Sequence, residues 1–298
     1  MPAARIFALL ILALLLGSAA LVLAARRSSR FADGVIRSLT HHGSAGAILP
    51  TSPNYELIFL RMGDGTRIAA QVGRALDREG KPLGGYAQRP TVIYCYPGGG
   101  TLRWSSPQFE GFRRLGLNVV MPEYPGYGMS DGKPTEEGFH AAADAAYDYV
   151  LGREDLRHAG ILAAGWSLGG STVVDLASRR PVNGLVLLGT STTFDDICRN
   201  YAASHPVISW LLGPLFARFG WMVKLDSLSR IAAVQCPILV IRGTRDELVS
   251  EEMTGRLIAA AKSQVTFVPV AGASHFDLFR VGSARIWDAI GDWLAPIK

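Results

Sequence analysis

The sequence predicts an α/β protein in which a mostly parallel β-sheet is covered by helices on both faces. From residue 91 onward, short apolar runs alternate with longer helix-like segments. These runs lack polar alternation, as is typical of strands buried on both faces. Two earlier runs enclose a turn signal and indicate a hairpin at the start of the domain.

The hairpin is predicted from "YELIFLRM" and "TRIAAQV", which flank Gly63-Asp64-Gly65. Buried strands are expected at "TVIYCY" (91–96), "LNVVM" (117–121), "GILAAG" (160–165), "GLVLLG" (184–189), "PILVIRG" (237–243) and "QVTFVPV" (264–270). Helices are expected over 105–115, 135–151, 168–180, 250–262 and 282–294. The segment 191–235 exceeds a simple crossover in length and is rich in large apolar residues. We therefore expect a short helical insertion over one edge of the sheet.

The N-terminal segment, residues 1–25, is interpreted as a single-pass transmembrane anchor. Residues 6–25 form an uncharged apolar run long enough to span a bilayer as a helix. The alternative is a cleaved signal peptide, with Ser18-Ala19-Ala20 at the cleavage site and a secreted or periplasmic product. We favour the anchor because the apolar run continues past that site as far as Arg26. Residues 26–50 are expected to be a linker, and residues 51–298 the α/β domain.

The charge distribution argues against a nucleic-acid partner. The formal net charge is +5, but four of the 30 basic residues lie within residues 1–30, where there is no acidic residue. The rest of the chain carries 26 basic against 25 acidic residues and has no basic cluster. The three cysteines, Cys95, Cys198 and Cys236, have no metal-ligand spacing. No metal or organic cofactor is expected.

A candidate nucleophile follows the strand at 160–165. Gly165-Trp166-Ser167-Leu168-Gly169 is a G-x-S-x-G sequence between a strand and a helix. A sharp turn there would lift the serine hydroxyl above the sheet edge, at a helix N-terminus that favours negative charge. The two glycines would let neighbouring backbone approach closely. A serine that merely caps a glycine-rich helix is the alternative, which the strand–turn–helix context disfavours.

A serine hydroxyl needs a base that removes its proton, and the base needs an orienting acid. Of the six histidines, only His275 in "AGASHFDLF" follows a strand end in a short loop. Asp246 in "PILVIRGTRDELV" also lies just beyond a strand. The order Ser167, Asp246, His275 is the one expected for this architecture. Glu247 is the nearest substitute for the acid, and a helix N-cap is the alternative role of Asp246.

Acyl chemistry at Ser167 also requires donors for a developing oxyanion. The backbone N–H of Leu168 is one candidate, because it directly follows the nucleophile. The second is expected in "YPGGGTLRW", where glycines allow close approach of backbone amides. We choose Gly99, with Gly98 and Gly100 as alternatives.

These motifs together resemble the α/β-hydrolase family, and most closely the membrane-anchored serine hydrolases of the fungal bud-emergence type and the animal abhydrolase-domain proteins. The resemblance covers roughly residues 54–298 and includes "PGGGT", "PEYPGYGMSDGKPTEEGFHAAADAAYDYV", "GWSLGGSTV", "CPILVIRGTRDELVS" and "GASHFDLF". It implies an eight-stranded, mostly parallel sheet and a triad of Ser167, Asp246 and His275. The sequence departs from the family at Pro97, where many relatives have histidine, and this leaves open how the oxyanion loop is held.

The expected activity is hydrolysis of an ester, thioester or amide through an acyl-enzyme intermediate. An acyltransferase and a catalytically silent, membrane-tethered binding module are the alternatives. Pocket walls are expected from Trp104, Tyr127, Phe194 and Trp221, which together would favour a small-molecule or lipid-like acyl substrate. The sequence does not indicate an oligomeric state.

Overall fold

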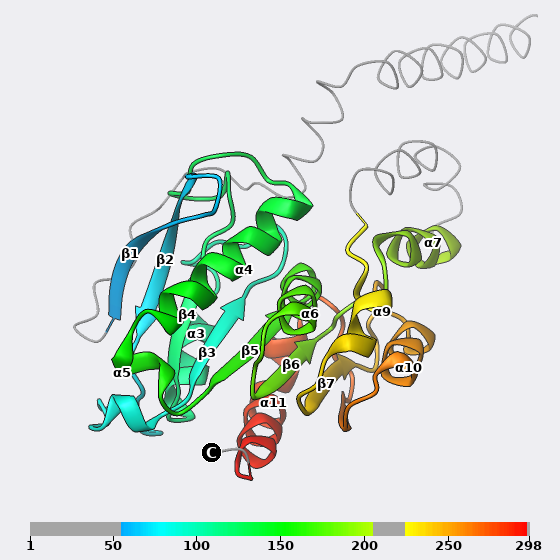
Figure 1. Ribbon diagram of the computed structural model, residues 1–298. Helices are drawn as coiled ribbons and strands as arrows, with labels where there is room; N and C mark the ends of the chain where they lie inside the picture. Colours follow the sequence, from blue (N-terminus) through cyan, green and yellow to red (C-terminus); the bar gives the residue numbers. More distant parts are fainter. Residues whose placement is uncertain (1–54, 205–223, 297–298) are drawn as a thin grey trace, which may run out of the picture. The chain divides into compact units, whose positions relative to one another are not determined.

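The structure, a computed structural model, describes residues 55–204 and 224–296. Its centre is a sheet of eight strands in the order β1-β2-β4-β3-β5-β6-β7-β8 (Figure 1). The strands are β1 (Tyr55–Arg61), β2 (Arg67–Gly73), β3 (Thr91–Cys95), β4 (Asn118–Pro122), β5 (Ile161–Trp166), β6 (Gly184–Leu188), β7 (Ile238–Gly243) and β8 (Val265–Val270). Strand β2 pairs antiparallel with β1 and β4, and every other pair is parallel. The predicted mostly parallel sheet is confirmed.

Strands β1 and β2 form the expected hairpin. The turn closes with a hydrogen bond from the Met62 N–H to the Thr66 carbonyl. Gly65 adopts φ 85° there, a left-handed conformation that favours glycine. The side chain of Asp64 accepts a hydrogen bond from the Thr66 N–H at 2.9 Å, which fixes the chain reversal.

Helices cover both faces of the sheet, with α4 and α6 in front of it and α3 and α11 behind it in the view of Figure 1. They are α3 (Ser106–Arg114), α4 (Glu136–Leu151), α5 (Glu154–Arg157), α6 (Leu168–Arg179), α7 (Phe194–Ser204), α9 (Ser227–Arg230), α10 (Glu251–Ala260) and α11 (Leu278–Leu294). Two short 3₁₀ helices span Tyr86–Gln88 and Ile231–Ala233. Several of these helices have a side-chain N-cap. At the start of α4, for example, the Thr135 side chain accepts a hydrogen bond from the Gly138 N–H.

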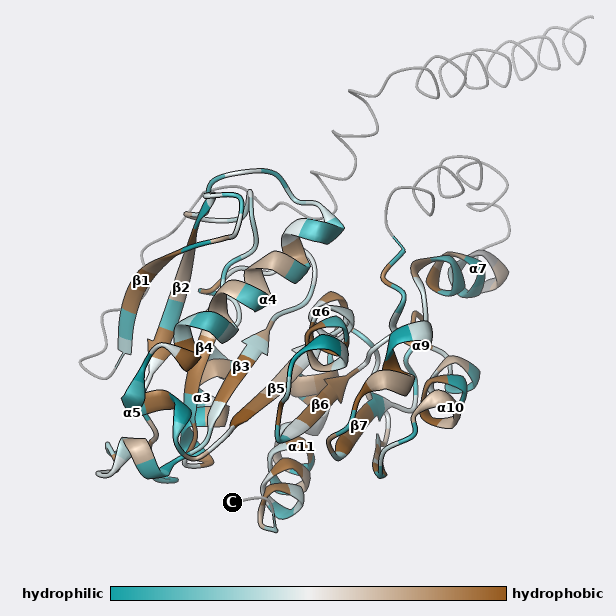
Figure 2. Cartoon of the chain, in the orientation of Figure 1, coloured by the Kyte–Doolittle hydropathy of each residue, from teal (hydrophilic) through white to brown (hydrophobic). Residues whose placement is uncertain are grey.

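The core lies between the sheet and these helices. Every residue of β3, β4, β6 and β7 is buried, which explains why these strands read as continuous apolar runs (Figure 2). Behind the sheet, the Trp287 ring of α11 contacts the Phe112 ring of α3 edge to face. Their ring centroids are 5.1 Å apart. The two helices thus pack against each other in one layer on this face of the sheet.

The predicted insertion is described at both of its ends, as α7 and as α9 with the following 3₁₀ turn. The two ends are joined by a hydrogen bond from the Phe194 N–H to the Lys224 carbonyl at 2.8 Å. A second bond runs from the Ser227 N–H to the Thr192 carbonyl at 2.9 Å. The predicted anchor (1–25) and linker (26–50) lie outside the described residues. Within 55–204 and 224–296, no helix combines the length and apolarity needed to cross a membrane.

Candidate active site

Ser167 sits in a tight turn between β5 and α6. Its backbone adopts φ 54° and ψ −116°, a conformation that side-chain-bearing residues rarely take. The turn is held by hydrogen bonds from the Ser167 N–H to the Leu188 carbonyl and from the Gly170 N–H to the Ser167 carbonyl, both at 2.9 Å. The hydroxyl therefore projects from the carboxyl edge of the sheet, where parallel α/β proteins place their chemistry.

The two glycines of the motif make this turn possible. A Cβ atom at Gly165 would lie 2.2 Å from the Gly169 carbonyl oxygen. A Cβ atom at Gly169 would lie 1.9 Å from the carbonyl oxygen of Cys95 in the neighbouring strand. Both obstacles are main-chain atoms of buried segments and cannot move aside cheaply. The glycines thus let α6 begin directly against β3 and β5.

The structure brings His275 and Asp246 to Ser167. The Nε2 atom of His275 lies 2.9 Å from Ser167 Oγ, and its Nδ1 atom lies 2.9 Å from Asp246 Oδ2. The imidazole is 4% exposed and the carboxylate is also buried. The hydroxyl, imidazole and carboxylate therefore form a continuous hydrogen-bonded row that could pass a proton from Ser167 to His275.

Asp246 is held by its own loop rather than by a helix. Its Oδ1 atom accepts hydrogen bonds from the backbone N–H groups of Leu248 at 3.0 Å and Val249 at 2.7 Å. The N-cap of α10 is Ser250, whose side chain accepts from the Met253 N–H. The structure therefore does not give Asp246 the alternative role of a helix cap. The neighbouring Glu247 is exposed.

One residue that contacts this row was missed from the sequence. Gly189 directly follows β6, has φ 49° and faces the pair formed by Asp246 and His275. A Cβ atom there would lie 3.4 Å from Asp246 Oδ2 and 3.4 Å from the His275 ring. A glycine after a buried strand was visible in "GLVLLG", but nothing in that run showed which side chains cross it.

The loop after β3 lies beside the start of α6, as expected for an oxyanion-binding loop. A Cβ atom at Gly98 would be 3.5 Å from the Leu168 side chain, and Gly99 adopts φ 75°. The Gly100 N–H donates to the Pro97 carbonyl at 3.1 Å, so it is already used within the loop. Gly98 and Gly99 therefore remain the candidates for the second oxyanion donor. The Leu168 N–H lies in the first turn of α6, where the helix offers no acceptor of its own.

The four residues expected to line the pocket lie in different settings. Trp104 is 75% exposed, and Phe194 is half-buried against the core. Tyr127 is only 1% exposed and packs against the rings of Tyr124 and Phe139, so it lies in the core rather than on an open wall. Trp221 is outside the described residues. Phe276, directly after His275, is 75% exposed and was not singled out from the sequence.

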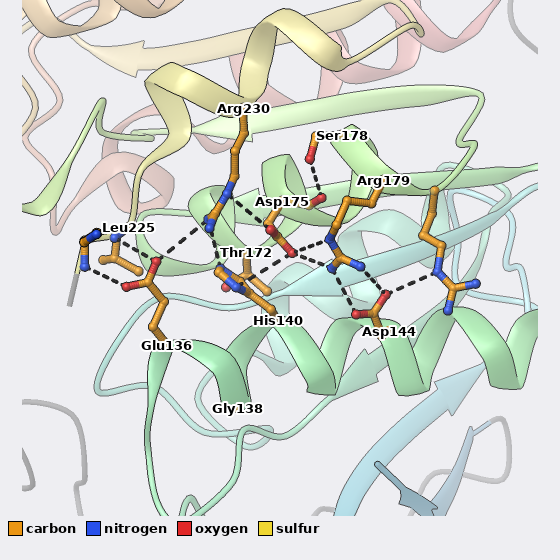
Figure 3. A network of polar contacts seen from close by, with 12 residues as sticks. Glu136, Gly138, His140, Asp144, Thr172, Asp175, Ser178, Arg179, Leu225 and Arg230 are labelled. Carbon is orange, nitrogen blue, oxygen red and sulfur yellow. Dashed lines mark hydrogen bonds and ion pairs between the residues drawn. The ribbon is translucent and has the colours of Figure 1, made fainter. Parts of the chain in front are cut away.

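A polar network joins α4, α6 and α9 (Figure 3). Asp175 of α6 is buried and forms ion pairs with Arg179 and, at 3.3 Å, with Arg230. Glu136 of α4 accepts hydrogen bonds from the backbone N–H groups of Lys224 at 2.6 Å and Leu225 at 3.1 Å. The network therefore fixes the returning end of the insertion to the helix that carries Ser167 at its start.

The described part of the chain contains no group of three histidine, cysteine or acidic side chains arranged to hold a metal ion. Burial raises the pKa of the Cys95 thiol to about 12 and that of the Cys236 thiol to about 11. Neither thiol is therefore prepared to act as a nucleophile near neutral pH.

Comparison with known proteins agrees with this architecture. Residues 90–210 match the model of the alpha/beta hydrolase fold family. An uncharacterized protein of Mycobacterium tuberculosis is 33% identical over 224 residues, which cover 73% of this chain and 76% of that protein. The alpha/beta hydrolase domain-containing protein WAV2 of Arabidopsis thaliana is 27% identical over 78% of this chain and 76% of its own length.

Among solved structures, a Pyrococcus furiosus esterase superposes with a TM-score of 0.65. The alignment covers 80% of this chain and 89% of the esterase at 18% identity. An alpha-beta serine hydrolase homologue from Coxiella burnetii superposes with a TM-score of 0.60 at 19% identity, covering 82% of this chain and 100% of that one. These structures share the fold. With the family match and the mycobacterial relative, they show that the chain belongs to the alpha/beta hydrolase family.

Proposed function

We propose that this alpha/beta hydrolase family member is a serine hydrolase that cleaves an ester, thioester or amide through an acyl-enzyme. One observation carries the proposal: Ser167, in a strained turn, is 2.9 Å from a buried imidazole whose other nitrogen is 2.9 Å from a buried carboxylate. Each of the three residues lies just beyond the end of a different strand, β5, β7 or β8. In such a row the imidazole can remove the proton of the serine hydroxyl and so activate it as a nucleophile.

In the proposed reaction, Ser167 Oγ attacks the substrate carbonyl carbon while its proton passes to His275 Nε2. The negative charge that develops on the carbonyl oxygen is stabilised by the N–H groups of Leu168 and Gly99. His275 then returns the proton to the leaving group, and the acyl group remains on Ser167. Water, deprotonated by the same imidazole, releases the acid and restores the serine. Asp246 accepts a hydrogen bond from the Nδ1–H group throughout, and so keeps the imidazole in the required tautomer and stabilises the imidazolium that forms.

The direct test is labelling with a fluorophosphonate, which phosphonylates an activated serine. We expect label on Ser167, no label in Ser167→Ala, and a loss of turnover on the order of 10⁴–10⁶-fold in that variant. Ser178→Ala is the matched control, because its hydroxyl bonds only to a carbonyl within α6. A native protein that takes no label would contradict the proposal and favour a silent binding module. Labelling with acyl transfer to alcohols exceeding hydrolysis would favour an acyltransferase.

We further propose that the substrate carries an apolar acyl chain. The support is the exposure of two large aromatic side chains, Trp104 after the glycine loop and Phe276 after His275. Each methylene buried against such a wall contributes about 0.8 kcal/mol, or about fourfold in binding. Catalytic efficiency on p-nitrophenyl esters should therefore rise from acetate toward butyrate or octanoate. An acetate optimum with no dependence on chain length would refute this substrate class.

A membrane-bound location is proposed from the apolar run at residues 6–25. The full-length protein should then sediment with membranes and resist extraction by high salt. A mature N-terminus near Leu21, detected by mass spectrometry, would show a cleaved signal peptide instead.

A further inference from the structure

The block "PEYPGYGMS", which begins at Pro122, the last residue of β4, takes no part in the row of Ser167, His275 and Asp246. Its place in the sheet nevertheless puts it beside the glycine loop. Strand β4 pairs in parallel with β3, so the segments that leave their carboxyl ends are neighbours. Residues 97–102 lie in the segment after β3 and carry Gly99, one of the two oxyanion donors of the proposed function. We call residues 97–102 the oxyanion loop.

Tyr124 holds the start of the oxyanion loop. Its hydroxyl donates a hydrogen bond to the carbonyl oxygen of Tyr96 at 2.8 Å. In the other direction, the backbone N–H of Tyr124 donates to the Tyr96 hydroxyl at 3.2 Å. Both tyrosines are fully buried, and their ring centroids are 4.7 Å apart. The residue that precedes Pro97 is therefore fixed by two hydrogen bonds and a ring contact.

Glu123 holds the other end. One carboxylate oxygen, Oε1, accepts from the Leu102 N–H at 3.4 Å, and the other, Oε2, accepts from the Met129 N–H at 2.8 Å. The residue is 2% exposed. Gly128, with φ 44°, lies directly against the carboxylate. A Cβ atom at this position would lie 2.2 Å from Oε1. The turn after β4 thus encloses an acidic group that contacts the oxyanion loop.

From these contacts, and on the basis of the proposed function, we infer that Glu123 and Tyr124 are positioning residues that hold the oxyanion loop at its two ends. The contacts of Glu123 and Tyr124 thus keep in place a loop that begins with Pro97. Its three consecutive glycines, Gly98, Gly99 and Gly100, have no side chains with which to pack. The positions of its N–H groups therefore depend on how the flanking residues Tyr96 and Leu102 are held.

The expected effect falls on the transition state more than on substrate binding. Removing one oxyanion donor typically costs about 10²–10³-fold in kcat, and a displacement of about 1 Å can cost about 10²-fold. Loosening one end of the loop should displace the donor without removing it. We therefore expect kcat to fall about 10–100-fold, while KM changes less than about twofold.

The first test is Tyr124→Phe, which removes the hydroxyl and keeps the ring. The matched control is Tyr147→Phe, because the Tyr147 hydroxyl also donates to a backbone carbonyl at 2.8 Å, that of Pro181 at the far end of α6. Both variants lose one hydroxyl-to-carbonyl hydrogen bond, which is buried at Tyr124 and partly buried at Tyr147, so both should lower the melting temperature, Tyr124→Phe at least as much as Tyr147→Phe. Only Tyr124→Phe should slow turnover and the fluorophosphonate labelling of Ser167.

The second test is Glu123→Gln, which replaces one acceptor oxygen by an amide group and leaves the Leu102 or Met129 N–H without its partner. Burial raises the pKa of Glu123, so the neutral amide avoids the cost of a buried charge, although it leaves one backbone N–H unpaired. A melting curve of the variant checks that it is folded. Its labelling rate should nevertheless fall about tenfold or more. If Tyr124→Phe fails to fold, the labelling rate of Glu123→Gln still tests the positioning role.

The outcomes separate this inference from the proposed function. Labelling of both variants at the native rate, with native Ser167 labelled, would overturn the positioning role alone. Slower labelling of Tyr147→Phe equal to that of Tyr124→Phe would overturn it too, because the effect would then follow stability. A native protein with no label on Ser167 would overturn the proposed function and this inference with it.

Discussion

Replacing Gly169 by alanine tests whether the start of α6 is packed against β3 as tightly as the structure indicates. The added Cβ atom would lie 1.9 Å from the Cys95 carbonyl oxygen and 2.4 Å from its carbonyl carbon. An ordinary contact begins near 3.4 Å, so α6 or β3 must shift by more than 1 Å. Overpacking a buried site costs typically 1–3 kcal/mol. We take the upper end, about 3 kcal/mol, because the obstacle is main chain in a fully buried strand.

The matched control is Gly255→Ala in α10. Nothing lies within 4 Å of the Cβ position there, and the residue is exposed on a helix. Both substitutions gain up to about 1 kcal/mol of helix propensity, which cancels when the two variants are compared. At about 2 °C per kcal/mol for a chain of this size, Gly169→Ala should melt about 6 °C below Gly255→Ala. Melting followed by circular dichroism measures this difference, and equal melting temperatures would refute the packing argument.

Two further predictions follow from the pKa shifts. Burial raises the pKa values of Cys95 and Cys236 to about 12 and about 11, so Ellman's reagent at pH 8 should leave both thiols unmodified until guanidinium unfolds the chain. Fast modification of all three cysteines in the native protein would contradict their placement. Burial also lowers the pKa of His140 below 6.5, so the stabilisation present above pH 6.5 is lost as pH falls toward the folded-state pKa. Denaturant titrations should show the native protein losing stability relative to His140→Gln between pH 8 and pH 5, and an increase would refute this sign. The charged side chains that face His140 are Glu136, Asp175, Arg179 and Arg230.

The sequence predicts the strands and the three side chains of the candidate site for the same physical reason. Strands buried on both faces read as uninterrupted apolar runs, and the residues just beyond them lie at one edge of a parallel sheet. Ser167, Asp246 and His275 were each chosen because they follow such a run. The structure places them within hydrogen-bond reach of one another. Their chain positions were therefore sufficient, without any knowledge of the intervening loops.

The contacts of Glu123 and Tyr124 could not be predicted in the same way, because they depend on the order of strands in the sheet. Along the chain, β4 follows β3, but in the sheet it lies between β2 and β3. Periodicity indicates that a strand exists and gives no information about its neighbour. Tyr127 was misplaced on a pocket wall for a related reason: an aromatic residue in a glycine-rich turn can equally face the core, where its ring meets Phe139.

The strand order also explains why Gly189 lies beside Asp246 and His275. His275 follows β8 and Ser167 follows β5, and three strand spacings of about 4.8 Å separate these strands by about 14 Å. An imidazole side chain alone cannot bridge that distance, so the loop after β8 must fold back across the ends of β7 and β6. Gly189, directly after β6, has a left-handed backbone and lies beside Asp246 and His275, which a Cβ atom there would meet at 3.4 Å. The left-handed backbone therefore favours glycine at a position beside the hydrogen-bonded row that carries no chemistry of its own.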